Sequence, residues 1–106
     1  HGTGTNYNDE MESIAFNRLK LNHIPLNSLK GYFGHTLGAA GVIEVISSIK
    51  MMEHKTILKS LGFEKQGTSM KLNIVKVNKK KPIQTILKTA SGFGGGNASL
   101  ILKLTT

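Results

Sequence analysis

The sequence has no cysteine and no tryptophan among its 106 residues, and it has only two prolines. Without cysteine the chain can form no disulfide, no thiolate metal site and no covalent intermediate on a thiol. It also lacks an apolar run of about 18 residues, so we predict no membrane-spanning segment, and no signal peptide is visible. A chain of this length can form one small domain, but its hydrophobic core would be modest.

Acidic residues are also scarce: six Asp and Glu face 14 Lys and Arg, which gives a formal net charge of +8. Such a surface attracts acidic partners, namely nucleic acid, an anionic membrane or an acidic protein. A soluble lysine-rich protein without any electrostatic role is also a common outcome. Charge alone therefore does not select a function.

The chain begins on His1-Gly2-Thr3-Gly4-Thr5, a polar loop without an initiator methionine. We interpret it as the exit of a strand whose body lies upstream. A free end of this kind is expected to fray. We therefore expect a fragment or a subunit of a larger protein.

Two helices are predicted from the spacing of apolar residues. The first runs from about Asp9 to Lys20, with acidic residues in its first turn and apolar residues at i, i+3, i+4 and i+8 from Met11. The second runs from about Leu37 to His54 and is apolar most of the way round, which indicates a buried helix. Gly38 and Gly41 weaken this helix, so we expect close packing there.

The remaining apolar runs predict strands. The last two are joined by a glycine loop, Ser91–Asn97, which favours an antiparallel pair. The order of helices and strands indicates a layered α/β or α+β arrangement. The predicted extended segments are Ile24–Leu29 leading to Lys30, Ile57–Leu61, Ile74–Val77, Ile83–Thr89 and Ala98–Leu104.

Three motifs contain histidine or glycine in unusual spacing. Alone, His35 is more often a hydrogen-bonded structural residue, and the loop Gly92–Gly96 is more often a tight hairpin. The loop is not a phosphate cradle, because it lacks the Lys-Ser/Thr ending and a helix behind it.

Taken together, the motifs resemble the C-terminal half of β-ketoacyl-acyl-carrier-protein synthases, the thiolase-like condensing enzymes of fatty acid and polyketide synthesis. The resemblance implies a layered α-β-α arrangement with a mixed β-sheet. Residues 1–106 would form one C-terminal domain fragment, without the N-terminal half that bears the nucleophile. The motifs are His1-Gly2-Thr3-Gly4-Thr5 with Asn8-Asp9-x-x-Glu12, Lys30-x-x-x-Gly34-His35-x-Leu37-Gly38-Ala39-Ala40-Gly41, and Gly92-Phe93-Gly94-Gly95-x-Asn97.

The resemblance assigns catalytic roles to three residues. His1 and His35 match the histidines that hydrogen-bond the malonyl thioester carbonyl and assist its decarboxylation. Lys30 matches a lysine that organises the site and discourages protonation of the histidines. Glu12 matches the acid that pairs with this lysine and makes its burial tolerable.

The resemblance also assigns binding residues. Thr3 and Thr5 match threonines that bind the phosphopantetheine arm of the carrier protein. Phe93 matches the aromatic that gates the acyl pocket, and its backbone N–H contributes to the oxyanion hole. The neighbouring Gly92, Gly94 and Gly95 let this loop move. No metal and no organic cofactor is implied beyond the partner's phosphopantetheine.

Departures from the family pattern limit the prediction. The family nucleophile is a cysteine of the N-terminal half, so this chain alone is expected to be inactive. The cysteine would come from a missing half or a partner subunit, in a cytoplasmic homo- or heterodimer that accepts an acyl carrier protein. Tyr7 and Ser91 differ from the residues expected beside the pocket, which leaves chain-length preference open.

Two alternatives remain beside the condensing acyltransferase. A non-condensing relative, either a chain-length partner or a malonyl decarboxylase, would retain the histidines without the cysteine. A basic nucleic-acid-binding module is the weakest, because the lysine run has no aromatic residues for base stacking. Candidate residues for docking an acidic carrier protein are Lys76, Lys79, Lys80, Lys81 and Arg18.

Overall fold

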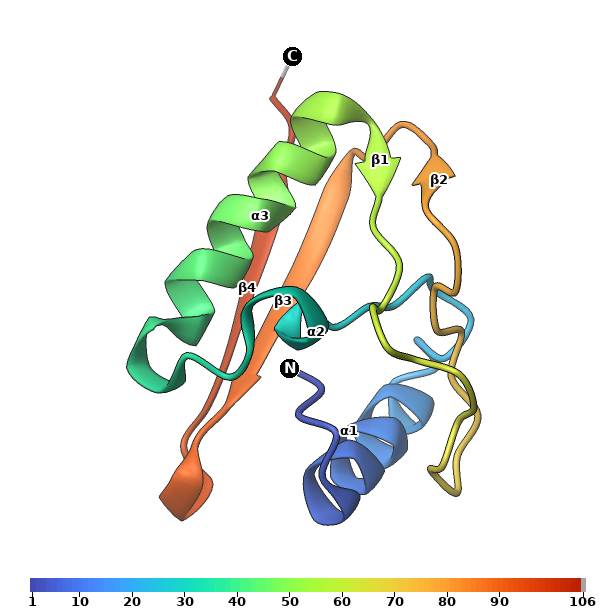
Figure 1. Cartoon of the computed structure of the whole chain (residues 1–106), viewed down its shortest axis with the longest axis vertical. Coiled ribbons are helices and arrows are strands. Elements are labelled where there is room, and N and C mark those ends of the chain that lie inside the picture. Colours follow the sequence, from blue (N-terminus) through green and yellow to red (C-terminus); the bar gives the residue numbers. More distant parts are fainter. Residues whose placement is uncertain (106) are drawn as a thin grey trace. The chain divides into compact units, whose positions relative to one another are not determined.

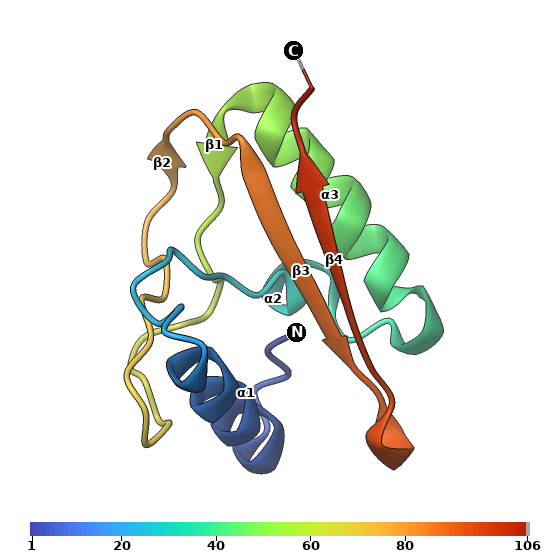
Figure 2. The same cartoon turned by 180° about the vertical axis from the view of Figure 1, so that it is seen from behind.

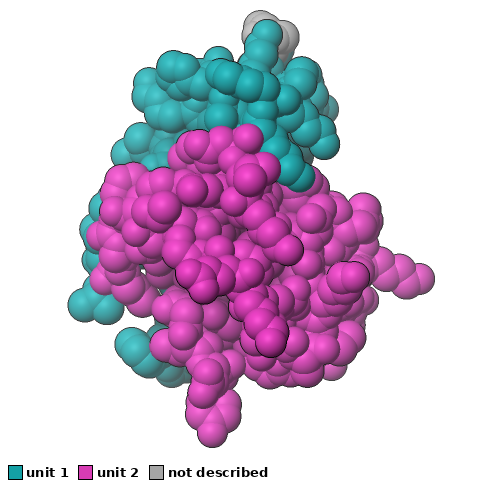
Figure 3. All heavy atoms as spheres, turned by 45° about the vertical axis from the view of Figure 1, so that its right-hand side comes forward, with its two compact units in different colours: residues 1, 36–57, 79–106 teal, residues 2–35, 58–78 magenta. Residues whose placement is uncertain are grey.

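The computed structural model describes residues 1–105. It comprises two compact units: unit 1 contains residue 1, residues 36–57 and the chain from residue 79 onward, and unit 2 contains residues 2–35 and 58–78 (Figure 3). Between residues 1 and 105, no helix is both long and apolar enough to cross a bilayer.

Unit 2 contains helix α1 (Asn6–Arg18) and the single-turn helix α2 (Lys30–Phe33). α1 begins three residues before the predicted start, and its buried side chains are Glu12 and Ser13. The prediction of a buried apolar face on this helix is wrong, because Met11 is 42% exposed and Leu19 is 68% exposed. The buried face of α1 is polar, and it bonds to loops as described below.

One parallel β-bridge joins Leu26 to Ile74 in unit 2. The Leu26 N–H donates to the Asn73 carbonyl, and the Val75 N–H donates to the Leu26 carbonyl, both at 2.9 Å. The predicted strands Ile24–Leu29 and Ile74–Val77 do not form as full strands, and this single bridge is their pairing in the structure. The backbone pairing does not continue beyond Leu26, because the Ser28 N–H donates to the side-chain hydroxyl of Ser60 and not to a backbone carbonyl.

Unit 1 combines one long helix with two antiparallel strand pairs (Figures 1 and 2). The predicted hairpin is confirmed with shifted bounds, and Lys88 lies opposite Leu100. A shorter sheet pairs Thr56 and Ile57, at the start of the predicted segment Ile57–Leu61, with Lys79 and Lys80, for which no strand was predicted. The elements are the 3-10 helix η1 (Leu37–Ala39), α3 (Ala40–His54), β1 (Thr56–Ile57), β2 (Lys79–Lys80), β3 (Thr85–Ser91), η2 (Phe93–Gly95) and β4 (Asn97–Lys103).

The second helix has the predicted extent, with a 3-10 first turn, but only one of its faces is buried. The opposite face is exposed, with Val42 at 64% and Ile46 at 53%, so the prediction of a helix buried on all sides is wrong for this chain. The apolar pattern did not reveal the buried face because that face includes two polar side chains. The buried residues of α3 are Ala40, Glu44, Ser48, Met51 and Met52.

The glycines of this region are needed in places other than those predicted. A Cβ at Gly38 or Gly41 would have no neighbour within 4 Å, so the predicted close packing is not found among the described residues. Gly31 does have that role: its Cβ would lie 2.2 Å from the Leu61 carbonyl oxygen. Gly34 is required by its φ of 77°, which ends α2.

Candidate active site

The loop that precedes α1 is held by an aspartate of that helix. The Asp9 carboxylate accepts the backbone N–H of Thr3 at 3.0 Å and that of Gly4 at 3.1 Å. Gly4 has a φ of 76°, which only glycine adopts readily. The hydroxyls of Thr3 and Thr5 then lie 2.6 Å apart. The two threonines assigned to the pantetheine arm therefore form a pair, fixed by Asp9.

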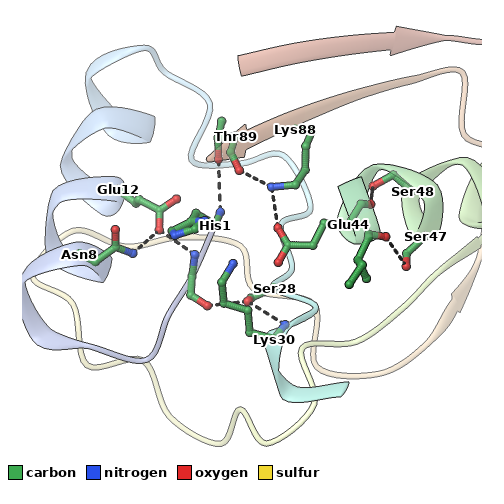
Figure 4. Close-up of polar contacts among 12 residues, drawn as sticks. His1, Asn8, Glu12, Ser28, Lys30, Glu44, Ser47, Ser48, Lys88 and Thr89 are labelled. Atoms are coloured by element: carbon green, nitrogen blue, oxygen red, sulfur yellow. Dashed lines mark hydrogen bonds and ion pairs between the residues drawn. The ribbon is translucent and has the colours of Figure 1, made fainter. Parts of the chain in front are cut away.

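Glu12 lies one turn further along α1 and is buried. Its carboxylate accepts the Gly2 N–H and the Asn8 side-chain amide, both at 2.8 Å (Figure 4). Because charged groups stay ionised in the interior only with such partners, these bonds explain how the acid is tolerated there. They do not test the pairing of Glu12 with Lys30, which stays a prediction.

Lys30 is the first residue of α2, and His35 follows the end of this helix in unit 2. The Lys30 N–H donates to the Ser28 hydroxyl at 3.4 Å, and that hydroxyl donates to the Gly2 carbonyl at 2.6 Å. The start of α2 is therefore tied to the loop at Gly2. α2 closes where the Gly34 N–H donates to the Lys30 carbonyl at 2.8 Å, and His35 follows on the surface.

His1 belongs to unit 1, and its terminal amino nitrogen donates to the Thr89 hydroxyl of β3 at 3.3 Å. The adjacent Lys88 forms an ion pair with Glu44 of α3, with 2.7 Å between Nζ and Oε1 (Figure 4). Lys88 also donates to the Thr89 carbonyl. Because His1 and His35 lie in different units, their joint action stays a prediction.

The glycine loop connects β3 to β4 in the form of a tight turn. The Gly92 N–H donates to the Gly96 carbonyl at 2.7 Å, and Gly94 and Gly95 have φ values of 82° and 85°. These positive values explain the glycines without reference to a ligand. Phe93 is fully exposed at the start of the turn. Its predicted gating role is not tested by this geometry.

Sequence reasoning missed four residues that contact the predicted site residues or one another. Ser28 and Thr89 had no distinguishing signal, because exposed hydroxyls are common in loops and strands. Glu44 and Lys88 did have one: each is a charge within an apolar segment. Charged residues are almost never buried without a partner, so a helix–strand ion pair could have been predicted from them.

Within residues 1–105, no group of three or more His, Asp or Glu side chains could hold a metal ion. The site residues that the structure brings together are hydrogen-bond donors and acceptors. Such groups can bind the amides of an arm or stabilise a developing oxyanion.

The motifs and fold place the chain in a known family. Residues 1–64 match the family model described as the C-terminal domain of beta-ketoacyl synthase, which is more than half of the chain. The chain therefore belongs to the β-ketoacyl synthase family, as the sequence motifs predicted.

Individual proteins agree with this assignment. A putative β-ketoacyl synthase 1 for granaticin polyketide, from Streptomyces violaceoruber, is 33% identical and covers 96% of this chain and 25% of its own length. The 3-oxoacyl-[acyl-carrier-protein] synthase 1 of Escherichia coli (strain K12) is 36% identical, over 97% of this chain and 26% of its own length. The chain thus spans about a quarter of the curated relatives it matches.

The fold agrees as well. The crystal structure of a beta-ketoacyl synthase from Burkholderia phymatum STM815 superposes with a TM-score of 0.94 and 31% identity. The match covers the whole of this chain and 26% of that one. The predicted thiolase-like α/β class is confirmed.

Proposed function

We propose that this chain acts as the C-terminal part of a β-ketoacyl-acyl-carrier-protein synthase, in fatty acid or polyketide synthesis. The observation that supports this most is the presence of all three motifs, in order, in a chain that aligns almost completely with such synthases. A segment outside these 106 residues would supply the cysteine that carries the acyl group.

The proposed reaction is a decarboxylative Claisen condensation. The bond between the malonyl methylene carbon and its carboxylate breaks, CO₂ leaves, and the electron pair becomes an enolate whose oxygen carries the charge. His1 and His35 donate hydrogen bonds to that oxygen. The enolate carbon then attacks the acyl thioester carbonyl, and the cysteine thiolate leaves. Fixed donors that face a developing oxyanion lower the barrier most in a site that excludes water.

The supporting residues fit this chemistry. The paired hydroxyls of Thr3 and Thr5, 2.6 Å apart, offer partners for the amides of a phosphopantetheine arm. The carrier protein would bring that arm, so no metal or organic cofactor is required of this chain. We also expect a dimeric complete enzyme, measurable by light scattering, and a cytoplasmic location, measurable by fractionation.

A basic cluster offers a docking surface for an acidic carrier protein. The Lys81 N–H donates to the Lys55 carbonyl at 2.8 Å, and Thr56 pairs with Lys80. With Lys79, these contacts gather four exposed lysines at one end of unit 1. Opposite charges on a partner would steer its approach.

Replacement of His35 tests the proposal. In the complete polypeptide, His35→Ala should lower the rate of malonyl decarboxylation ~100- to 1000-fold, the loss typical for one oxyanion donor. Release of labelled CO₂ from malonyl-carrier protein measures this rate. His23→Ala, at an exposed histidine of the same unit, is the matched control and should retain the activity. Normal decarboxylation by His35→Ala contradicts the catalytic assignment.

Labelling of a cysteine thiol distinguishes a condensing enzyme from the non-condensing alternative. If a cysteine of the complete polypeptide is alkylated by iodoacetamide and protected by prior acylation, the protein is a condensing enzyme. If decarboxylation occurs without such a cysteine, it is a malonyl decarboxylase.

A further inference from the structure

Unit 1 contains far more lysines than acidic residues. Its two acidic side chains are Glu44 and Glu53. Glu44 pairs with Lys88 at 2.7 Å, and Glu53 pairs with Lys50 at 3.0 Å. Both acids of the unit are therefore already paired with a lysine. The lysines of unit 1 beyond these two pairs are Lys55, Lys79, Lys80, Lys81 and Lys103.

The short β1–β2 sheet brings four of these lysines together. Figure 1 shows β2 beside β1, directly after the end of α3. Lys79 and Lys80 form β2, and the pairing continues where the Lys81 N–H donates to the Lys55 carbonyl at 2.8 Å. Because side chains alternate along a strand, Lys79 and Lys81 lie on one face and Lys80 lies on the other. Lys55 is the cross-strand neighbour of Lys81, and like charges at such positions are destabilising.

The backbone of Lys55 adds a second unfavourable contribution. It ends α3 in a left-handed conformation with a φ of 49°, where glycine is the usual residue. A cation is favourable near the C-terminus of a helix, which accounts for Lys55 by itself. It does not account for Lys79 and Lys81 on the facing segment. All three side chains are exposed, so the core does not require them. An excess of one charge at a fixed place indicates an anionic partner.

We propose that the acidic carrier protein docks on one face of the β1–β2 sheet, where its carboxylates contact Lys55, Lys79 and Lys81. This inference rests on the proposed function and narrows the docking surface to three lysines, because Lys80 lies on the opposite face. Each exposed ion pair is weak by itself, so a partner with several carboxylates fits these cations better than one small anion does. Paired strands also hold the lysines in a preformed arrangement, which lowers the entropy lost on binding.

The test compares malonyl-carrier protein with malonyl-pantetheine, which lacks the protein, as substrates of the complete polypeptide. Lys79→Ala/Lys81→Ala should raise KM for malonyl-carrier protein ~3- to 30-fold at low salt, the sum of two weak ion pairs. This increase should shrink in about 0.5 M NaCl, because salt screens exposed charges. The kcat/KM for malonyl-pantetheine should stay within about twofold, since that substrate makes no contact with the lysines.

Single variants distinguish the two faces of the sheet. Lys81→Ala should raise KM for malonyl-carrier protein more than Lys80→Ala does, although each removes one exposed charge. Lys65→Ala removes an exposed lysine of unit 2 and should leave this KM unchanged. Lys55→Gly should raise KM without lowering Tm, because glycine adopts a positive φ readily. A lower Tm with an unchanged KM would show that Lys55 serves the fold and not the partner.

The outcomes separate the two proposals. If the unmodified polypeptide decarboxylates neither substrate, the proposed function is wrong. If it does, and Lys79→Ala/Lys81→Ala has the unmodified KM for malonyl-carrier protein, the docking inference is wrong. In that case, single-stranded DNA that binds the unmodified polypeptide but not the double variant would assign the lysines to nucleic acid. Equal increases for Lys80→Ala and Lys81→Ala would overturn the assignment to one face.

Discussion

Helices α1 and α3 use their carboxylates differently. In unit 2, Asp9 and Glu12 of α1 accept backbone N–H groups from the loop before the helix, and Glu10 accepts one from Ser69. In unit 1, Glu44 of α3 instead accepts a lysine side chain. The first arrangement restrains a main chain whatever side chains the loop carries. The second depends on two specific side chains, and it fails if either is lost.

The comparison explains why the two regions suit different tasks. The proposed pantetheine arm would need hydroxyls at a fixed spacing, and the bonds from the Thr3 and Gly4 N–H groups to Asp9 restrain the loop that carries them. In unit 1 the terminal amino nitrogen of His1 contacts Thr89, which lies 88 residues away in the sequence. Contacts over that range must come from tertiary packing, and the ion pair connects helix and strand at that place.

The largest expected loss of stability comes from removal of one charge of the Glu44–Lys88 ion pair. Glu44→Gln leaves the Lys88 ammonium buried without its counter-ion, which should destabilise the protein by about 3–5 kcal/mol. Lys88→Met/Glu44→Gln should recover most of this, because no charge remains buried. Thermal unfolding of the complete polypeptide measures both. If the double variant is as unstable as the single one, the pair is not the reason for the loss.

A smaller loss of stability is expected when the loop clamp is weakened. This clamp consists of the bonds from the Thr3 and Gly4 N–H groups to the Asp9 carboxylate. Asp9→Asn keeps the shape of the side chain, but its amide nitrogen cannot accept, so either the Thr3 or the Gly4 N–H loses its partner. The expected loss is about 1–2 kcal/mol, with a raised KM for pantetheine substrates.

The matched control for the loop clamp is Glu53→Gln. It removes an exposed carboxylate that pairs with Lys50 at 3.0 Å and should change stability by less than about 1 kcal/mol. If Asp9→Asn leaves both stability and KM unchanged, the clamp does not shape the loop.

The parts of the fold that depend on short-range patterns were predictable from the sequence. Helices α1 and α3 and the β3–β4 hairpin follow from apolar spacing and from the glycine loop between strands. The motifs also identified the family, because they preserve residue types at fixed spacing. The periodicity of apolar residues and the spacing of motif residues can be read from the sequence, because both depend only on residues close together in the chain.

The burial pattern was not predictable in the same way. The predicted buried residues Met11 and Val42 are exposed, whereas Glu12 and Glu44 are buried. Hydrophobicity does not reveal a polar group that is buried because it has a partner, and that partner can lie far away in the sequence. Lys88 and Glu44 are separated by 44 residues in the chain.

The smallest expected effect concerns Glu10, whose contact with Ser69 is exposed. The Ser69 hydroxyl and backbone N–H both donate to its carboxylate, and these bonds hold the pKa of Glu10 below its usual value. A lowered pKa in the folded state means that the contact stabilises the fold above the unfolded pKa of about 4.3 and that this is lost as pH falls. The difference in Tm between the unmodified protein and Glu10→Gln should therefore be constant near neutral pH and shrink below about pH 4. A difference that grows on acidification would show that the ionised carboxylate does not hold Ser69, and the contrast between α1 and α3 would then depend on Asp9 and Glu12 alone.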